Sequence, residues 1–252
     1  MERQYKKILI ECLDNGVFRN DRTGIGSYSI FSKDIFIDLN KGFPLITGRL
    51  IKENIFKTEF KWFINGSTNT LLFKNNNIKI WDAWADENGE LGPIYGYQML
   101  NFNGQKINQL EKLISSLQND KDSRRHIITL WNPIQLSEMR LPPCYLYFQF
   151  FVENNKLNML VLQRSGDLFL GIPYDMALFA QFLLYISEKV NLIANKINLK
   201  IVDAHIYKNQ ITPVNEYLKQ SINKLPGFIY KNENLEISNY NTTKIITSKV
   251  AI

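Results

Sequence analysis

The sequence predicts an α+β protein, because helical and strand-like segments mix without the regular alternation of a doubly wound parallel sheet. Apolar residues recur at helical spacing over residues 2–14, whereas residues 27–39 alternate between apolar and polar side chains, as a strand does. A hydrophobic content of 45% in 252 residues is enough to bury a large core. We find no linker, repeat or low-complexity segment, and therefore expect a single domain over residues 1–252.

The individual elements follow from local patterns along the chain. Helical spacing of apolar residues predicts helices over residues 2–14, 54–64, 108–120 and 175–191. Alternation predicts strands over residues 27–39, 125–133, 144–165 and 197–210. The segment 144–165 is long enough for two strands, and its sequence ENNK is typical of a hairpin turn. The sequence DNG after residue 13 ends the first helix.

Composition and charge exclude several classes of protein. No stretch approaches the roughly 20 apolar residues of a membrane span, and charges interrupt the apolar positions of the N-terminus, unlike those of a signal peptide. The net charge of +6 comes largely from lysines scattered among Asn and Ile, without the basic stripe and interleaved aromatics of a nucleic-acid interface. We therefore expect a cytoplasmic protein that binds neither membrane nor nucleic acid.

The cysteines and histidines are too few and too dispersed for a disulfide framework or a metal site. Cys12 and Cys144 form no CxxC motif, and only His126 and His205 are available as imidazole ligands. Cys144 directly follows two prolines at the head of an apolar strand. It is either a buried core thiol or a side chain that the prolines hold at the edge of a pocket, where Arg164 on the paired strand would favour its thiolate.

A single carboxylate interrupts an otherwise apolar segment. Asp175 lies between the apolar runs 168–172 and 176–182, and burying a lone carboxylate is costly. Either it turns outward on a helix, or a ligand in a pocket needs two acceptor oxygens at that point. The arginines are also informative, since Arg is the residue best suited to bidentate phosphate capture and few are present in patterned segments. These are Arg22, Arg124, Arg125 and Arg164.

An ordered set of motifs resembles the thymidylate synthase family over nearly the whole chain. The motifs are DRTGIG, FPLITGR, IWDAWADENGELGPIYGYQ, SRRHIITLWNP, LPPC, QRSGD, FLGIPYD, DAHIY and the terminal VAI. The resemblance implies a homodimeric α+β fold with a large mixed sheet at the dimer interface. It also implies a pyrimidine nucleoside monophosphate as substrate, 5,10-methylenetetrahydrofolate as one-carbon donor, and no metal.

The resemblance also implies a role for each matching residue. Cys144 matches the nucleophile that adds to C6 of the pyrimidine, Glu59 the carboxylate that organises the proton-transfer water network, and Tyr95 a proton-transfer residue. The implied phosphate ligands are Arg22, Arg164 and Ser165, with Arg124 and Arg125 donated by the other subunit. The remaining nucleotide ligands are Asp167 at the pyrimidine and the pair His205 and Tyr207 at the 3′-hydroxyl. The implied folate-side residues are Lys52, Trp81, Trp84, Asp167, Gly171 and Ile252.

Taken singly, these residues have ordinary structural interpretations. Glu59 is typical of a solvated helix position, the two tryptophans of core aromatics, and His205 of a hydrogen-bonded strand residue. Arg124 and Arg125 are typical of a surface pair. It is the ordered set of motifs that favours the functional interpretation.

Three positions depart from the family pattern. Asp175 stands where members that use dUMP carry Asn, Tyr145 stands where His usually follows the nucleophile, and Arg49, Leu50 and Lys52 replace a Lys-Arg-x-His pattern. A side-chain amide matches the N3–H donor and O4 acceptor of uracil. Cytosine instead carries an amino donor at C4, and its N3 becomes basic when the thiolate adds to C6, so a carboxylate accepts from two adjacent donors.

Asp175 therefore favours a cytosine nucleotide, and the resemblance extends to deoxycytidylate hydroxymethylases of the same fold. We expect a deoxycytidylate 5-hydroxymethyltransferase with Asp175 as a catalytic and substrate-binding residue. Three alternatives stay open. The terminal VAI, Trp81 and Tyr95 fit a thymidylate synthase acting on dUMP, a dCMP methylase would combine Asp175 with hydride transfer, and a non-catalytic RNA-binding or scaffold homologue would use none of this chemistry.

Overall fold

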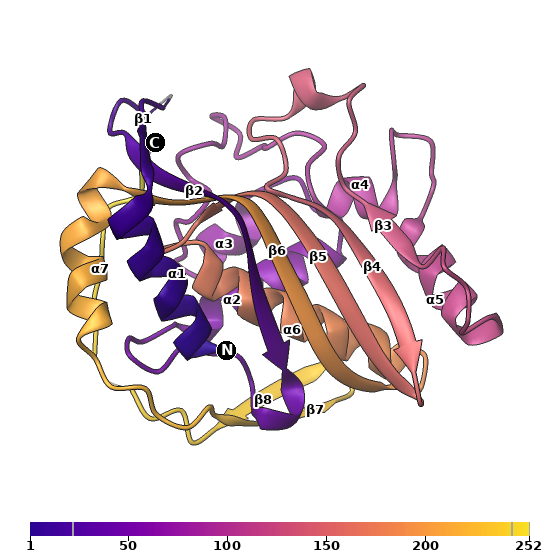
Figure 1. Cartoon of the computed structure of the whole chain (residues 1–252). Coiled ribbons are helices and arrows are strands. Elements are labelled where there is room, and N and C mark those ends of the chain that lie inside the picture. Colours follow the sequence, from indigo (N-terminus) through magenta and orange to yellow (C-terminus); the bar gives the residue numbers. More distant parts are fainter. Residues whose placement is uncertain (22, 243, 252) are drawn as a thin grey trace.

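The structure is a computed structural model that describes residues 1–21, 23–242 and 244–251 (Figure 1). The helices are α1 Glu2–Asn15, α2 Glu53–Ile64, α3 Leu71–Asn75, α4 Gly96–Leu100, α5 Gln109–Asn119, α6 Ile172–Lys189 and α7 Ile211–Leu218. The strands are β1 Val17–Arg19, β2 Ser27–Asp38, β3 Ile127–Thr129, β4 Tyr145–Glu153, β5 Lys156–Asp167, β6 Ile193–Tyr207, β7 Gly227–Lys231 and β8 Asn234–Ser238. Within these ranges no helix has the length and apolar content needed to cross a membrane.

The centre of the fold is a six-stranded mixed sheet in the order β1-β2-β6-β5-β4-β3. β5 and β6 pair in parallel through the crossover helix α6, and the other neighbours are antiparallel. In Figure 1, α2 and α6 lie behind β4, β5 and β6, whose other face is turned toward the viewer. This arrangement confirms the predicted α+β class with a large mixed sheet.

Most of the predicted elements are present, with three differences. The predicted strand over residues 125–133 shrinks to β3, because the chain turns away from the sheet after Leu130, whose N–H donates to the carbonyl of Leu146 at 2.7 Å. The strand predicted over residues 197–210 begins earlier, at Ile193, and ends at Tyr207. Residues 208–210 form a short 3₁₀ helix. The sequence patterns also missed the short elements α3, α4, α7, β1, β7 and β8.

The ENNK segment forms the predicted hairpin turn. Asn154 and Asn155 have φ angles of 47° and 64°, in the left-handed region that a two-residue hairpin of this kind requires and that Asn tolerates. Glu153 pairs with Lys156 across the turn, which fixes the register of β4 against β5.

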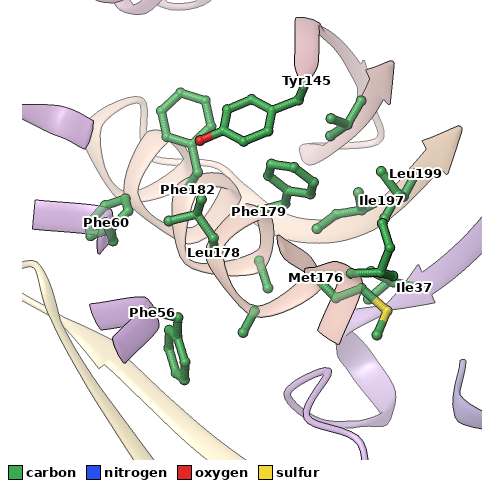
Figure 2. Packing of buried hydrophobic residues seen from close by; sticks show 14 of the residues in the cluster. Ile37, Phe56, Phe60, Tyr145, Met176, Leu178, Phe179, Phe182, Ile197 and Leu199 are labelled. Carbon is green, nitrogen blue, oxygen red and sulfur yellow. The ribbon is translucent and has the colours of Figure 1, made fainter. Parts of the chain in front are cut away.

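The core is built around α6, which is buried on most of its surface (Figure 2). Phe182 packs against Phe148 of β4 at a ring distance of 5.0 Å and against Phe63 of α2 at 5.4 Å. Phe179 meets Tyr145 edge to face at 5.1 Å. Since α6 is held between the sheet and α2, its first turn, which contains Asp175, has little freedom to move.

A buried carboxylate at the start of α1 holds the loop that precedes α2. Glu2 is 3% exposed, and its Oε2 accepts hydrogen bonds from the backbone N–H and the hydroxyl of Thr47, both at 2.8 Å. Its Oε1 accepts from the N–H of Gly48 at 3.0 Å and from the hydroxyl of Tyr217 at 2.8 Å. Four donors thus satisfy the charge of Glu2 and tie α1, this loop and α7 together.

We predict that Glu2→Gln lowers the free energy of unfolding by about 1–3 kcal/mol. Either orientation of the new amide places its NH₂ against a backbone N–H, because each oxygen of Glu2 faces one such donor. Glu11→Gln is the matched control on the same helix, since Glu11 forms a surface ion pair with Lys33. Urea denaturation measures both variants, and equal losses for the two would contradict this account of Glu2.

Candidate active site

Cys144 immediately precedes β4, and both of its backbone polar groups are held. Its N–H donates to the hydroxyl oxygen of Tyr95 at 3.0 Å, and its carbonyl accepts from the N–H of Arg164 at 2.8 Å. Cys144 is partly exposed, whereas Cys12 is buried on α1 with its thiol directed at the carbonyl of Tyr28. Of the two thiols, Cys144 is therefore the one that a ligand can reach.

Arg164 lies against the segment that carries Cys144, as the hairpin predicted. Its Nε donates to the carbonyl of Pro143 at 2.9 Å and its Nη2 to the carbonyl of Pro142 at 2.8 Å. The guanidinium carbon also lies 5.7 Å from the centre of the Trp131 ring. These contacts hold the positive charge of Arg164 close to Cys144.

Tyr95 adopts a strained backbone conformation to reach Cys144. Its φ of 42° is uncommon for a bulky residue, and such strain often occurs at functional sites. The next residue, Gly96, begins α4, and a Cβ there would lie 2.0 Å from the carbonyl of Phe63. Only glycine allows α4 to approach α2 this closely, and the approach brings the Tyr95 ring to 4.5 Å from Tyr145.

Glu59 extends from α2 beside a cluster of aromatic rings. Its Oε1 accepts a hydrogen bond from the indole Nε1 of Trp81 at 3.3 Å. Trp81 lies 5.7 Å from Tyr95 and 5.8 Å from Trp84, measured between ring centres. Trp84 has a buried Nε1 without a hydrogen-bond partner among the described residues.

Asp175 points inward from the first turn of α6, which begins after Gly171. Its Oδ2 accepts a hydrogen bond from Nε2 of Gln163 at 2.9 Å. The same nitrogen donates to the carbonyl of Ser165 at 3.1 Å. The outward-facing alternative for Asp175 is therefore wrong.

Sequence analysis did not assign a site role to Gln163 or Tyr145. Alternate side chains of β5 are buried in the core, and Gln163 is one of them. A polar residue at such a position is a signal that could have identified Gln163 as a site residue. Tyr145 was recognised only as a departure from the family pattern. The Tyr145 ring is enclosed by Tyr95, Phe63 and Phe179, so it forms part of the wall beside Cys144.

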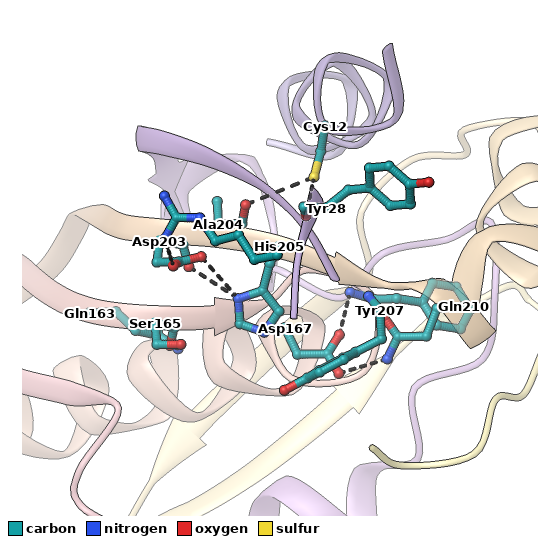
Figure 3. Close-up of polar contacts among 12 residues, drawn as sticks. Cys12, Tyr28, Gln163, Ser165, Asp167, Asp203, Ala204, His205, Tyr207 and Gln210 are labelled. Carbon is teal, nitrogen blue, oxygen red and sulfur yellow. Dashed lines mark hydrogen bonds and ion pairs between the residues drawn. The ribbon is translucent and has the colours of Figure 1, made fainter. Parts of the chain in front are cut away.

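A second polar cluster forms where β5 and β6 end (Figure 3). Asp167 accepts from the N–H groups of Phe169 and Leu170, both at 2.9 Å, and from Nε2 of Gln210 at 2.7 Å. Oε1 of Gln210 accepts in turn from the N–H of Tyr207 at 3.1 Å. Asp167 and Gln210 thereby fix the loop that leads into α6.

His205 pairs with Asp167 across the two strands and stacks edge to face on Tyr207 at 5.0 Å. Its Nδ1 lies 3.3 Å from Oδ1 of Asp203. Burial lowers the pKa of His205, but Asp203 and Asp167 raise it by more, so the net shift is upward. The cluster therefore holds a polar pair, His205 and Tyr207, at the same end of the sheet as Ser165.

The remaining predicted residues lie farther out or outside the described chain. Arg124 and Arg125 are exposed before β3, and neither guanidinium donates a hydrogen bond to a described residue of this chain. Lys52 is exposed at the start of α2. Arg22 and Ile252 lie outside the described residues.

Comparisons with known proteins agree with this geometry. The family described as Thymidylate synthase matches residues 3–252. The proteins named thymidylate synthase from Francisella tularensis subsp. holarctica strains FTNF002-00 / FTA, OSU18 and LVS are each 38% identical over 273 residues, covering 99% of this chain and 100% of theirs. The chain belongs to the thymidylate synthase family. It is a folate-dependent transferase that acts on C5 of a pyrimidine nucleotide.

The co-substrate of this thymidylate synthase family member is 5,10-methylenetetrahydrofolate. The residues present fit such a group, because the ring of Trp81 and the unpartnered indole N–H of Trp84 offer an aromatic surface and a donor to a flat heterocycle. Within the described ranges, no three His, Cys, Asp or Glu side chains are grouped so as to hold a metal ion.

Both carboxyl groups of the site hold their protons unusually tightly. Burial raises the pKa of Glu59 to about 8, and the negative charge of Asp175 adds to this effect while the Trp81 hydrogen bond opposes it. Burial also raises the pKa of Asp175 to about 7, against the hydrogen bond from Gln163. Asp175 therefore ionises first on raising the pH, and Glu59 stays protonated until a higher pH.

We predict that Glu59→Gln flattens the pH dependence of stability between pH 5 and pH 8. The unfolded chain releases the Glu59 proton near its ordinary pKa of 4.5, whereas the folded protein holds it until about pH 8. The folded protein thus binds more protons in this range, and its free energy of unfolding falls as the pH rises. Removing this group should reduce that fall by about 2–4 kcal/mol.

Urea denaturation at pH 5 and pH 8 measures the difference. Glu53→Gln is the control, because Glu53 lies on the same helix in an ion pair with Lys57. A pH dependence that is the same in wild type and Glu59→Gln would show that Glu59 ionises normally in the folded protein.

Proposed function

We propose that the chain transfers a one-carbon unit from 5,10-methylenetetrahydrofolate to C5 of dCMP, and that water completes the product, 5-hydroxymethyl-dCMP. The observation that carries the proposal is the inward-facing carboxylate of Asp175. Its Oδ2 is held by Gln163, and the residue keeps partial exposure. A ligand base can therefore meet a carboxylate oxygen at this point.

A carboxylate suits cytosine and repels uracil. When the Cys144 thiolate adds to C6, the electrons pushed toward N3 make that nitrogen basic. Once N3 is protonated, it and the 4-amino group present two adjacent donors, and a carboxylate accepts from both. With uracil bound, the acceptor O4 would face an ionised oxygen of Asp175, and the two would repel each other. A site that matches the hydrogen-bond pattern of cytosine therefore discriminates strongly against uracil.

The nucleophile and its neighbours support covalent catalysis. Cys144 is partly exposed, and the positive charge of Arg164 close by favours its thiolate. The hydroxyl of Tyr95 touches the Cys144 backbone. Glu59 retains its proton near neutral pH, so it serves as a proton donor to water at the base. Bound folate supplies the methylene carbon that C5 attacks.

Each end of the nucleotide has residues suited to hold it. We assign the phosphate to Arg164 and Ser165, together with Arg22 and the partner's copies of Arg124 and Arg125. We assign the 3′-hydroxyl to His205 and Tyr207, which lie edge to face at the end of β6.

The base and the folate are assigned to further residues of the site. We assign the pyrimidine to Asp167, whose hydrogen bonds order the loop that leads into α6. The folate-side residues in this assignment are Lys52, Trp81, Trp84, Asp167, Gly171 and Ile252.

We propose a homodimer joined through the open face of the sheet, which would bring the partner's arginines to the site. On this face, Phe31 and Phe36 of β2 and Phe151 of β4 alternate with buried residues and are 80%, 59% and 66% exposed. Such apolar exposure is typical of an interface. A groove of about 830 Å³ on the same face is lined by β2, β4, β5 and β6 and also by Arg124, which supports assigning this arginine to a site that crosses the proposed interface.

A second candidate is thymidylate synthase acting on dUMP. The relatives carry that name, and the ring of Trp81 beside Tyr95 gives the enclosed, apolar surroundings that hydride transfer needs. A dCMP methylase would combine the cytosine-selective Asp175 with the same enclosure. The base preference separates the dUMP enzyme from the two dCMP enzymes, and the product separates the latter.

We predict that Asp175→Asn shifts the ratio of kcat/KM values toward dUMP by about 10²-fold or more. The amide offers one donor and one acceptor, and a mismatched buried polar group costs about 1–3 kcal/mol. The loss should fall mainly on kcat for dCMP, because the hydrogen bond to N3 forms only as that atom becomes basic. Steady-state kinetics with both nucleotides measure the ratio. A wild type that prefers dUMP, or an unchanged ratio, would refute the proposal.

We predict that two inactive variants, Arg125→Glu and Cys144→Ser, regain activity when their subunits exchange. A mixed dimer has one site with a native Cys144 and a native arginine from its neighbour, so random mixing should restore about a quarter of wild-type activity. The control mixes Arg125→Glu with a variant that carries both substitutions, since no native Arg125 is then present. Mixed dimers that form and stay inactive would show that these arginines act within their own subunit.

A further inference from the structure

Gln163 is the direct protein partner of Asp175, and it is 2% exposed on β5. Its Nε2 reaches two oxygens, the carbonyl of Ser165 at 3.1 Å and Oδ2 of Asp175 at 2.9 Å. Gln163 and Asp175 come from the two elements that the core holds most firmly, β5 and α6. The contact between them is therefore a fixed part of the site.

The Ser165 carbonyl fixes the orientation of the Gln163 side-chain amide. A backbone carbonyl only accepts hydrogen bonds, so the nitrogen end of the amide must face it. The opposite orientation would set Oε1 against two oxygens. The same NH₂ group then faces Oδ2 of Asp175, and this oxygen must act as an acceptor whether or not Asp175 carries a proton.

The other oxygen of Asp175, Oδ1, has both of its lone pairs open to a ligand. Among the residues that the structure describes, none donates a hydrogen bond to Oδ1, and Asp175 is partly exposed whereas Gln163 is buried. If Asp175 is protonated, its proton sits on Oδ1, because Oδ2 faces a donor. Oδ1 thus changes from acceptor to donor when the carboxylate gains a proton.

We propose that Gln163 is a specificity-determining positioning residue, which confines the exchangeable proton of Asp175 to Oδ1, so that the site takes cytosine nucleotides when Asp175 is ionised and uracil nucleotides when it is protonated. The inference rests on the proposed function and extends it to a second substrate. Ionised Oδ1 accepts from one of the two adjacent donors, the protonated N3 or the 4-amino group, and the second lone pair of Oδ2 accepts from the other. Protonated Oδ1 instead donates to O4 of uracil.

The charges around Asp175 agree with a titration of this residue near neutral pH. Burial raises the pKa of Asp175 to about 7, the Gln163 hydrogen bond lowers it, and the charge of Asp167 at the end of β5 raises it. From α2, Glu59 is still protonated in this range and contributes no charge. Gln163 is therefore the group that keeps Asp175 ionised at lower pH than burial alone would allow.

The hydroxyl and thiol groups that face the site come from the starts of α4 and β4 and the residues just before them. Tyr95, just before α4, and Tyr145 of β4 both have a pKa raised well above the ordinary value by burial, so they are neutral when Asp175 titrates. Cys144, at the head of β4, acts on both substrates alike. A ratio of two substrates measured on one enzyme therefore isolates the protonation of Asp175 from these groups.

The test is the ratio of kcat/KM for dCMP to that for dUMP, measured from pH 5.5 to pH 8.5 in wild type, Gln163→Met and Asp175→Asn. In wild type the ratio should rise about tenfold per pH unit across this range, because dCMP uses the ionised fraction of Asp175 and dUMP uses the protonated fraction. In Gln163→Met the ratio should be about tenfold lower at each pH, because loss of the opposing hydrogen bond raises the pKa of Asp175 and so lowers its ionised fraction. In Asp175→Asn the ratio should not vary with pH.

Gln181→Met is the matched control, since Gln181 is buried on α6 and makes no hydrogen bond to Asp175. Its pH profile should coincide with that of wild type. A Gln163→Met profile that coincides with both would overturn the inference. If Gln163→Met does not fold, a wild-type ratio that is independent of pH, or an Asp175→Asn ratio that varies as much as wild type, overturns it equally. A preference for dUMP at every pH would instead refute the proposed function.

Discussion

The site depends on one constraint, the placement of two carboxyl groups, Glu59 and Asp175, in a part of the protein where ionisation of either disfavours ionisation of the other. Burial raises the pKa of each group, and the charge of Asp175 further raises that of Glu59. Each group accepts one hydrogen bond that lowers its pKa, Asp175 from Gln163 and Glu59 from Trp81, but only Glu59 has its pKa raised by the charge of the other carboxylate, so Asp175 ionises first. Near neutral pH the pair therefore consists of one carboxylate and one protonated acid. The carboxylate accepts hydrogen bonds from the base, and the acid donates a proton.

The packing of the helices against the sheet holds Glu59 and Asp175 in place. α6 is enclosed by aromatic side chains from the sheet and from α2, so the helix that carries Asp175 and the helix that carries Glu59 are packed against each other. Cys144 is fixed from two sides, by the hydroxyl of Tyr95 and by the backbone of Arg164. The strained φ of Tyr95 fits this account, since the surrounding packing overcomes a local preference to place one hydroxyl.

Much of this was predictable from the sequence, and the limits have physical causes. The α+β class, the long elements and the hairpin follow from periodicity, because each of these segments has one face buried. The positions of Cys144, Arg164 and Asp175 follow from motifs. The short strand β3 and the φ of Tyr95 were not predictable, because tertiary contacts override local pattern there. Gln163 was missed because its role depends on a carbonyl and a carboxylate that only the folded chain brings together.

The most direct test of the central claim, that Asp175 selects the base, is the mass of the product formed by the wild-type protein. The protein is incubated with 5,10-methylenetetrahydrofolate and equal concentrations of dCMP and dUMP at pH 8, where Asp175 is ionised. The account predicts that dCMP gains CH₂O and that dUMP is largely unchanged. Conversion of dUMP with a gain of CH₂, while dCMP stays unchanged, would contradict it.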